Sequence, residues 1–211
     1  MLRKTPGFFI SFEGTEGSGK STLIRQLADL LGRNGLKVQV TREPGGSPLA
    51  ERLRSILLET EMDSRTELYL YEAARAEHVA RIIRPALQRG EIVLCDRFTD
   101  STLAYQSYAR GLPWKEVLAL NRMATGGLEP NRVVFLDLDP KVGLERAQNP
   151  NRFEAEGLGF QKKVRLGFLK ARKENPEKWI SLKPGKHTPT ELADQVFSRL
   201  KKDLEKRSRR A

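Results

Sequence analysis

The stretch FFISFEGTEGSGKS, residues 8–21, decides the fold. Its first five residues are a nearly continuous apolar run, which is typical of a parallel strand buried on both faces. Gly14 to Ser21 then match the pattern G-x-x-x-x-G-K-[ST], and apolar residues at helical spacing follow from Leu23. A strand, a glycine-rich turn and a helix in this order form the context that a phosphate-binding loop requires.

The residues of this loop have the chemistry to bind a nucleoside triphosphate. Glycines let backbone N–H groups converge on phosphate oxygens, and the start of a helix adds positive potential. Lys20 would bring its charge to the β- and γ-phosphates, and the Ser21 hydroxyl would reach Mg²⁺. We therefore expect ATP and Mg²⁺ as cofactors. The expected nucleotide-binding residues are Gly14, Thr15, Glu16, Gly17, Ser18, Gly19, Lys20, Ser21 and Thr22.

Outward from this loop, strand and helix patterns alternate. Short apolar runs predict further strands at Lys37–Val40, Glu91–Cys95, Arg132–Leu138 and Trp179–Leu182. Amphipathic spacing predicts helices between them, among them one that begins at Pro48, a long one from about Thr66 to Gln88 and a last one through residues 192–204. This alternation predicts an α/β fold of the P-loop NTPase type, with a five-stranded parallel sheet and helices on both faces.

Length and composition limit the alternatives. The 211 residues suit one domain, which we expect to span residues 1–211. One cysteine and two histidines cannot build a disulfide framework or a zinc cluster. No apolar run approaches the ~20 residues of a membrane span, so we expect a cytoplasmic protein without a membrane partner.

The net charge of +11 is concentrated near the C-terminus, where seven basic and two acidic residues lie between Arg199 and Arg210. Such a segment can bind nucleic acid. No aromatic residues are interleaved with these charges, as they are in nucleic-acid platforms. We interpret the segment as the solvated end of the last helix.

Further charged residues at strand ends and helix starts indicate a second anionic substrate. Asp96 follows a buried strand at the edge where parallel sheets place their ligands, so it is expected to hold the metal together with Ser21. Arg42, Arg75 and Arg97 occupy similar positions. A single triphosphate does not need three more guanidinium groups, whereas a second phosphate opposite it does.

The loop also predicts a lid. Glu16 would repel phosphate, so it should face a hydroxyl, a metal-bound water or an arginine. The loop has no arginine to neutralise charge on the transferred phosphoryl group. The polar, glycine-containing segment at about 146–165 is the expected mobile lid, and Arg146, Arg152 and Arg165 are its candidate cations.

These motifs together resemble bacterial thymidylate kinases. The similar segments are residues 12–22, 41–46, 96–98, 100–106, 126–130 and 151–154, in the order and spacing of that family. The resemblance implies the nucleoside-monophosphate-kinase variety of the P-loop fold and the reaction ATP + dTMP → ADP + dTDP with Mg²⁺, in dTTP biosynthesis. It also implies a homodimer.

The resemblance also implies residue roles. Tyr71 would stack on thymine where the family often has Phe, Tyr105 would lie against the sugar, and Glu16 would receive its 3′-hydroxyl. Residues implied to be catalytic are Lys20, Arg97, Arg152 and Glu16. Those implied to bind the acceptor are Arg42, Tyr71, Arg75, Arg97, Ser101, Thr102, Tyr105 and Gln106.

Three alternatives stay open at this point: a P-loop kinase of another nucleotide or nucleoside, a nucleic-acid-stimulated ATPase, and a nucleotide-binding regulator without catalysis. An acceptor without a phosphate would leave Arg42 and Arg97 without a ligand. The nucleic-acid hypothesis rests on the charge alone and is not favoured. Cys95 is expected in the core, and no role is assigned to His78.

Overall fold

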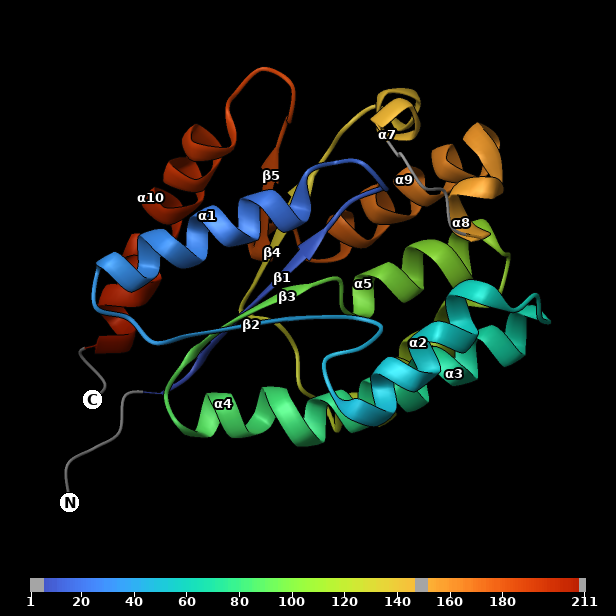
Figure 1. Ribbon diagram of the computed structural model, residues 1–211, viewed down its shortest axis with the longest axis horizontal. Coiled ribbons are helices and arrows are strands. Elements are labelled where there is room, and N and C mark those ends of the chain that lie inside the picture. Colours follow the sequence, from blue (N-terminus) through green and yellow to red (C-terminus); the bar gives the residue numbers. More distant parts are fainter. Residues whose placement is uncertain (1–5, 147–151, 209–211) are drawn as a thin grey trace.

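The computed structural model describes residues 6–146 and 152–208, and within them the chain forms a five-stranded parallel sheet (Figure 1). The strands lie in the order β2-β3-β1-β4-β5, and each neighbouring pair is parallel. Their bounds are β1 Phe8–Glu13, β2 Val38–Arg42, β3 Ile92–Asp96, β4 Arg132–Leu136 and β5 Trp179–Leu182. The α/β fold class predicted from the sequence is confirmed.

The helices connect these strands. They are α1 Lys20–Arg33, α2 Pro48–Glu59, α3 Ser64–His78, the π-helical η1 Val79–Ile83, α4 Arg84–Gln88, α5 Thr99–Thr102, the π-helical η2 Leu103–Ala109, α6 Trp114–Thr125, α7 Pro140–Arg146, α8 Arg152–Ala155, α9 Gly157–Glu174, the 3₁₀ turn η3 Pro176–Lys178 and α10 Pro189–Ser208.

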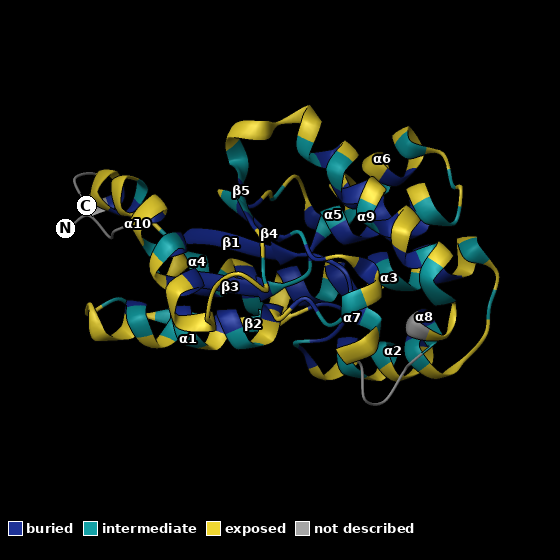
Figure 2. Cartoon of the chain, turned by 90° about the horizontal axis from the view of Figure 1, so that it is seen from above, coloured by how far each residue is buried: buried dark blue, intermediate teal, exposed yellow. Residues whose placement is uncertain are grey.

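Both faces of the sheet are covered, because successive side chains of a buried strand point to opposite sides. On β1, Phe8, Ile10 and Phe12 pack with the apolar sides of α1 and α10. Phe9 points the other way and packs with residues of η1 and α4. In Figure 2 the strands are accordingly mostly buried, whereas the helices are exposed on their outer sides.

The register of the strands positions the site. Phe12 of β1 and Arg42 of β2 both pair with Asp96, the last residue of β3. Three strands therefore end at the same level, and the segments that follow them meet at one edge of the sheet. This edge carries the phosphate-binding loop.

Two predicted elements differ from the structure. The helix expected from about Thr66 to Gln88 begins at Ser64 and is interrupted by the π-helical turn η1. The interruption ends two residues before Pro85, which has no N–H to donate and whose ring collides with the preceding helical turn.

The segment predicted as a mobile lid, at about residues 146–165, is helical in its second half. Residues 147–151, including Asn151 of the predicted lid motif, lie outside the described residues, but α9 is helical from Gly157. Val164 is buried and Phe160 partly buried, both packed with Tyr105. Phe160 and Val164 are four positions apart and therefore lie on the same, packed face of the helix. This face is hard to recognise in the sequence because the segment contains many charged residues.

The basic C-terminal segment is only partly solvated. Its side chains at 199, 201, 202 and 206 are exposed, as expected. Arg207 is buried, and its guanidinium donates to the backbone carbonyls of Pro6 and Gly90. One of the charges that suggested nucleic-acid binding therefore fastens α10 to the start of β1. Arg209 and Arg210 lie outside the described residues.

Among the described residues, no helix combines the length and the apolar character that crossing a lipid bilayer requires.

Candidate active site

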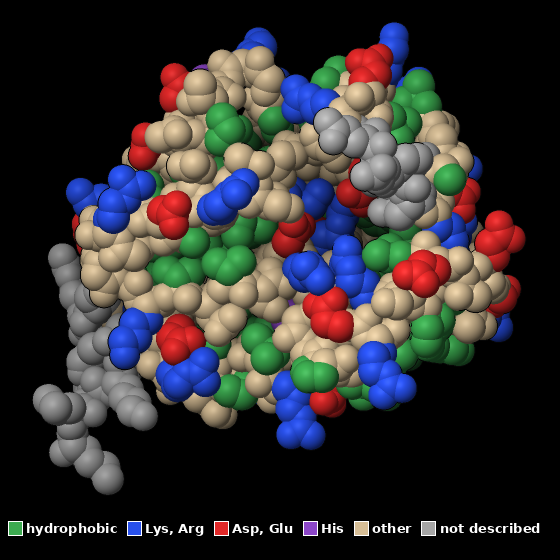
Figure 3. Space-filling view, in the orientation of Figure 1, with side chains coloured by type: hydrophobic (Ala, Val, Ile, Leu, Met, Phe, Trp, Pro, Cys, Tyr) green, Lys and Arg blue, Asp and Glu red, His purple; other side chains and the backbone are tan. Residues whose placement is uncertain are grey.

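A cavity of about 400 Å³ opens at the carboxyl ends of β1, β2 and β3, where open parallel sheets bind their ligands. Figure 3 shows basic side chains around a hollow near the middle of the face that it draws. Of the residues predicted to be catalytic or to bind nucleotide, acceptor or metal, all but Gly14, Thr15 and Arg152 line this cavity. The fold therefore assembles segments that are far apart in the sequence.

The phosphate-binding loop holds Lys20 in place through three of its own polar groups. The Lys20 ammonium donates to the carbonyls of Gly14 (3.2 Å) and Thr15 (3.1 Å) and to the Ser18 hydroxyl (3.4 Å). The backbone carbonyls of Gly14 and Thr15 thus position the ammonium group of Lys20. Burial, followed by the charge of Arg97, lowers the pKa of Lys20. A bound anion beside the buried ammonium would favour its charged form.

The loop rests on α7 through two glycines. A Cβ on Gly17 would lie 2.1 Å from the Gly143 carbonyl oxygen, and a Cβ on Gly143 would lie 2.3 Å from the Glu16 carbonyl oxygen. Neither position can carry a side chain without moving the backbone. Gly143 was not identified from the sequence, because it lies far beyond the motif in the chain and sits inside a helix.

Ser21 and Asp96 form an oxygen pair next to the loop. The Ser21 hydroxyl donates to Oδ2 of Asp96 at 2.9 Å, and both residues line the cavity. Oδ1 of Asp96 is buried and has no hydrogen-bond partner among the described residues. Carboxylate and hydroxyl oxygens are ligands that Mg²⁺ prefers. The donor set and the unpartnered oxygen therefore fit a magnesium ion.

Arg97 lies beside the phosphate-binding loop and lines the cavity. Its backbone has φ 68°, which is rare for a non-glycine residue and typical of functional sites. Its guanidinium donates to the Gly14 carbonyl (2.9 Å) and to Oε1 of Glu16 (2.5 Å), and it lies 5.1 Å from the Tyr105 ring centroid. Arg97 is thus aimed across the mouth of the phosphate loop.

Glu16 faces an arginine and a hydroxyl, as its position in the loop predicted. Besides Arg97, its carboxylate accepts a hydrogen bond from the Tyr105 hydroxyl at 3.4 Å. Burial by itself raises the pKa of Glu16, but the charges of Arg97 and Lys20 outweigh burial and lower it. Glu16 is therefore an ionised hydrogen-bond acceptor that lines the cavity.

Glu13 is a buried acid that the sequence analysis did not assign to the site. Its carboxylate accepts from the Phe98 backbone N–H (2.9 Å) and the Ser101 hydroxyl (2.6 Å), and Ser101 accepts from Arg97. Burial, followed by repulsion from Asp100, raises the pKa of Glu13 to about 8. Its position at the end of β1 could have pointed to a site residue. Its burial could not be predicted, because burial depends on how the other elements pack around the strand.

Two further arginines, from outside the loop, line the cavity. Arg42 pairs with Glu51 at 2.8 Å and is half-exposed. Arg54, on α2, also lines the cavity and donates to the Pro44 carbonyl at 2.8 Å. Burial, followed by the nearby charge of Arg42, lowers the pKa of Arg54. Arg54 was not predicted, because it lies in the middle of α2 and not at a strand end or a helix start.

Arg75 and Tyr71 line the other wall of the cavity. Arg75 is 2% exposed and donates to Glu43 (2.8 Å), Glu72 (2.9 Å), Asn121 (2.5 Å) and the Phe98 carbonyl (3.2 Å). These bonds use four of its five N–H groups, and one on Nη2 has no partner among the described residues. Arg75 can therefore donate one bond to a ligand.

Thr102 and Gln106 complete this wall. Thr102 is fully buried, and its hydroxyl has no partner in the described part of the chain. The Gln106 amide donates to Oε1 of the buried Glu67 at 2.7 Å. Both side chains offer polar groups to a ligand that fills the cavity.

Arg152 is not at the phosphate loop in this structure. It pairs with Glu67 at 2.7 Å and donates to the Leu57 carbonyl at 2.9 Å. The next residue, Phe153, lines the cavity, with its ring centroid 6.3 Å from Tyr71 and 5.8 Å from Tyr105. Of the other lid candidates, Arg165 pairs with Asp137 at 2.6 Å. Arg152 is thus bonded to residues of α2 and α3, whereas the adjacent Phe153 lines the cavity.

The chain is similar to known proteins over most of its length. The family described as thymidylate kinase matches residues 12–195. The thymidylate kinase of Desulfovibrio desulfuricans is 45% identical over 214 residues, covering 95% of this chain and 98% of that protein. That of Syntrophotalea carbinolica is 50% identical over 183 residues, covering 81% and 85%. A crystal structure of thymidylate kinase from Ehrlichia chaffeensis superposes with a TM-score of 0.77 at 33% identity, covering 93% and 99%.

Proposed function

The chain belongs to the thymidylate kinase family, and from that membership we propose how its residues transfer the γ-phosphoryl group of ATP to dTMP. The products are ADP and dTDP, a step in the synthesis of dTTP. One observation carries the assignment of residues: a single cavity has an ammonium-bearing loop at one end and guanidinium groups at the other.

The donor end binds ATP. The N–H groups of the loop and the start of α1 would surround the phosphates, and Lys20 would exchange its carbonyl partners for phosphate oxygens. Ser21 and Asp96 would hold Mg²⁺. When bound, the ion neutralises charge on the phosphate oxygens and fixes their orientation.

The acceptor phosphate of dTMP lies between Arg42, Arg54 and Arg97. Three guanidinium groups around one cavity end repel one another, so a dianion between them removes an unfavourable interaction as well as adding favourable ones. The hydrogen bond of Arg97 to the loop carbonyl of Gly14 fixes the distance between the two ends. The acceptor oxygen is thereby aimed at the γ-phosphorus, which is most of what phosphoryl transfer requires of a protein.

The thymine base stacks on Tyr71 and is read along its polar edge. The fifth N–H of Arg75 would donate to a base carbonyl, while Thr102 and Gln106 supply further polar groups. Tyr105 would lie against the deoxyribose and leave no room for a 2′-hydroxyl. Glu16 would accept from the 3′-hydroxyl, since its lowered pKa keeps it ionised.

Arg152 completes the site by moving. To neutralise charge on the transferred group, it must leave Glu67 and turn toward the loop. Closure would also exclude water, which would otherwise accept the phosphoryl group. We further propose that the chain acts as a homodimer. The exposed apolar side chains of Tyr69 on α3 and of Leu118 and Met123 on α6 support this, and sedimentation at micromolar concentration would test it.

A coupled assay of ADP release over a panel of nucleoside monophosphates tests the proposed substrate. We expect dTMP to give the highest kcat/KM and turnover with water alone to be negligible. Preference for another monophosphate would refute the acceptor while leaving the kinase reaction intact. ATP turnover that needs added DNA or RNA and falls with salt would favour the nucleic-acid-stimulated ATPase instead.

A further inference from the structure

His78 is the last residue of α3, fully buried, and engaged through both ring nitrogens. Its Nδ1 lies 3.0 Å from Oε1 of Glu43, and its Nε2 lies 2.6 Å from the Thr41 hydroxyl. The π-helical turn η1 starts at the next residue, and such turns are frequent at functional sites. Nothing in the proposed reaction yet uses this imidazole.

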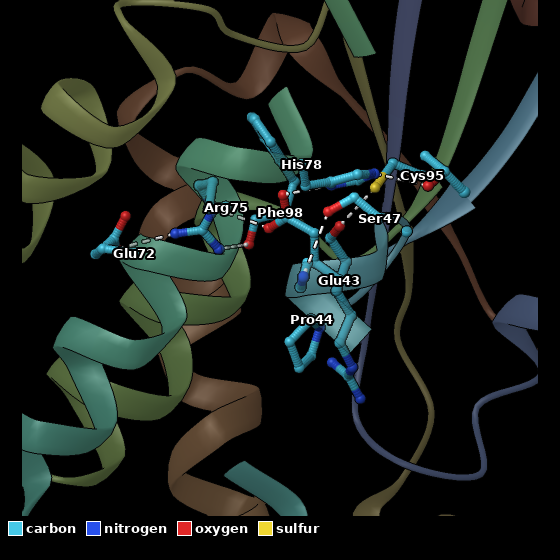
Figure 4. Close-up of polar contacts among 12 residues, drawn as sticks. Glu43, Pro44, Ser47, Glu72, Arg75, His78, Cys95 and Phe98 are labelled. Atoms are coloured by element: carbon cyan, nitrogen blue, oxygen red, sulfur yellow. Dashed lines mark hydrogen bonds and ion pairs between the residues drawn. The ribbon is translucent and has the colours of Figure 1, made fainter. Parts of the chain in front are cut away.

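Glu43 connects the imidazole to the cavity. Its second carboxylate oxygen, Oε2, accepts from Nε of Arg75 at 2.8 Å. Figure 4 shows Arg75 between Glu72 on its own helix and Glu43 after β2, with His78 on the far side of Glu43. Burial by itself lowers the pKa of Arg75, but the charges of Glu43 and Glu72 outweigh it and raise the pKa. The guanidinium is therefore fixed as a cation between two carboxylates.

The same imidazole fixes the end of β2. Thr41 and Glu43 flank Arg42, and all three residues lie where β2 passes into the Pro44–Gly46 turn. The turn packs directly on the ring, because a Cβ on Gly46 would lie 2.5 Å from Nε2 of His78. The Glu43 backbone N–H donates to the Asp96 carbonyl at 2.9 Å. Movement of the ring would thus displace the backbone that carries Arg42.

We infer that His78 is a positioning residue for the acceptor nucleotide. Through Glu43 it fixes Arg75 at the base end of the cavity, and through Thr41 it fixes the strand end that carries Arg42 at the phosphate end. The inference rests on the acceptor-binding roles proposed above for these two arginines. It assigns His78 no contact with substrate.

The energetic reason lies in the buried carboxylate. Glu43 is 5% exposed, and its two oxygens have one partner each in Arg75 and His78. Without the imidazole N–H, Oε1 would be buried without a partner, which a carboxylate avoids by rotating or by admitting water. Either response withdraws Oε2 from Arg75, whose remaining partners do not hold Nε.

The test compares three substitutions of His78 in the full-length protein. His78→Leu removes both contacts. His78→Asn keeps an N–H donor near the Nδ1 position, toward Glu43. His78→Gln keeps an amide near the Nε2 position, toward Thr41. Glu77→Gln, which removes a surface pair with Arg81, is the matched control on the preceding residue of α3. KM for dTMP, KM for ATP, kcat and thermal melting are measured for each variant.

We expect His78→Leu to raise KM for dTMP by roughly tenfold to a hundredfold, the loss typical of a charge-assisted hydrogen bond. KM for ATP should stay within about twofold, because the side chains that His78 contacts, Glu43 and Thr41, form no bond of their own with the phosphate loop among the described residues. His78→Asn should recover most of the loss and His78→Gln little of it. If His78→Leu does not fold, the difference in KM for dTMP between His78→Asn and His78→Gln tests the inference.

The inference is overturned if KM for dTMP is unchanged in a folded His78→Leu variant, if Asn and Gln behave alike, or if both KM values and kcat move together as in a general loosening. Failure of the proposed function is a separate result. In that case the wild-type protein prefers another monophosphate, and the same variants are then measured with that acceptor, whose KM should show the same pattern.

Discussion

Gly143 lies far from the sequence motif, yet its substitution should disable the phosphate-binding loop. In Gly143→Ala the new methyl carbon would lie 2.3 Å from the Glu16 carbonyl oxygen. Ordinary van der Waals contact is at least about 1 Å longer, so α7 and the loop must separate by roughly that distance. Misplacement of about 1 Å in a catalytic site can cost on the order of 100-fold in rate. We expect kcat/KM for ATP to fall by about that factor.

The matched control is Gly32→Ala. Gly32 is also a helical glycine without a positive φ, and a Cβ there meets no heavy atom within 4 Å. Both substitutions raise helix propensity by about 1 kcal/mol, so a difference between them isolates the contact with the loop. The assay is coupled ADP release at varied ATP, with melting curves to establish folding. A folded Gly143→Ala variant with kcat/KM for ATP within about threefold of Gly32→Ala would refute the reasoning.

Three further predictions concern the site itself. Burial and Asp100 raise the pKa of Glu13 to about 8 from an ordinary 4.5. Its stabilising contribution is therefore present below about pH 4.5 and is lost as the pH rises toward 8. Glu13→Gln should flatten this decline in urea unfolding between about pH 5 and 8, and parallel curves would contradict it. Arg152→Ala should lower kcat by roughly 10³, and a loss under about tenfold would exclude a role in the transition state. Tyr71→Ala should raise KM for dTMP by the equivalent of about 1–3 kcal/mol whereas Tyr71→Phe should not, and an unchanged KM in the alanine variant would exclude stacking.

The order of strands and helices was predictable because each element has a recognisable pattern in its own short stretch of sequence. The apolar run of β1, the glycines of the loop and the helical spacing after Leu23 each act within one or two turns of chain. The same holds for Arg42 and Asp96 at the strand ends, since parallel strands bring their carboxyl ends to one edge. Boundaries shifted where a single residue intervened, as Pro85 did at the start of α4.

Partners across the fold were not predictable. The spacing of charges in residues 146–165 gave no sign that Arg152 pairs with Glu67 or that Val164 packs against η2. In the sequence, Arg54 looks like a surface arginine on an amphipathic helix. It lines the cavity only because α2 packs near the end of β2.

The sequence alone determined what this protein binds at its donor end, because a phosphate cradle is made of consecutive backbone amides and needs only a short stretch of chain. Tertiary structure decided how the acceptor end is held. Its arginine side chains are long and flexible, so the local backbone conformation does not fix where their guanidinium groups lie. Their positions depend on the buried carboxylates with which they pair. The contact of Glu43 with both Arg75 and His78 joins residues more than 30 positions apart, and no periodicity in the chain encodes such a contact.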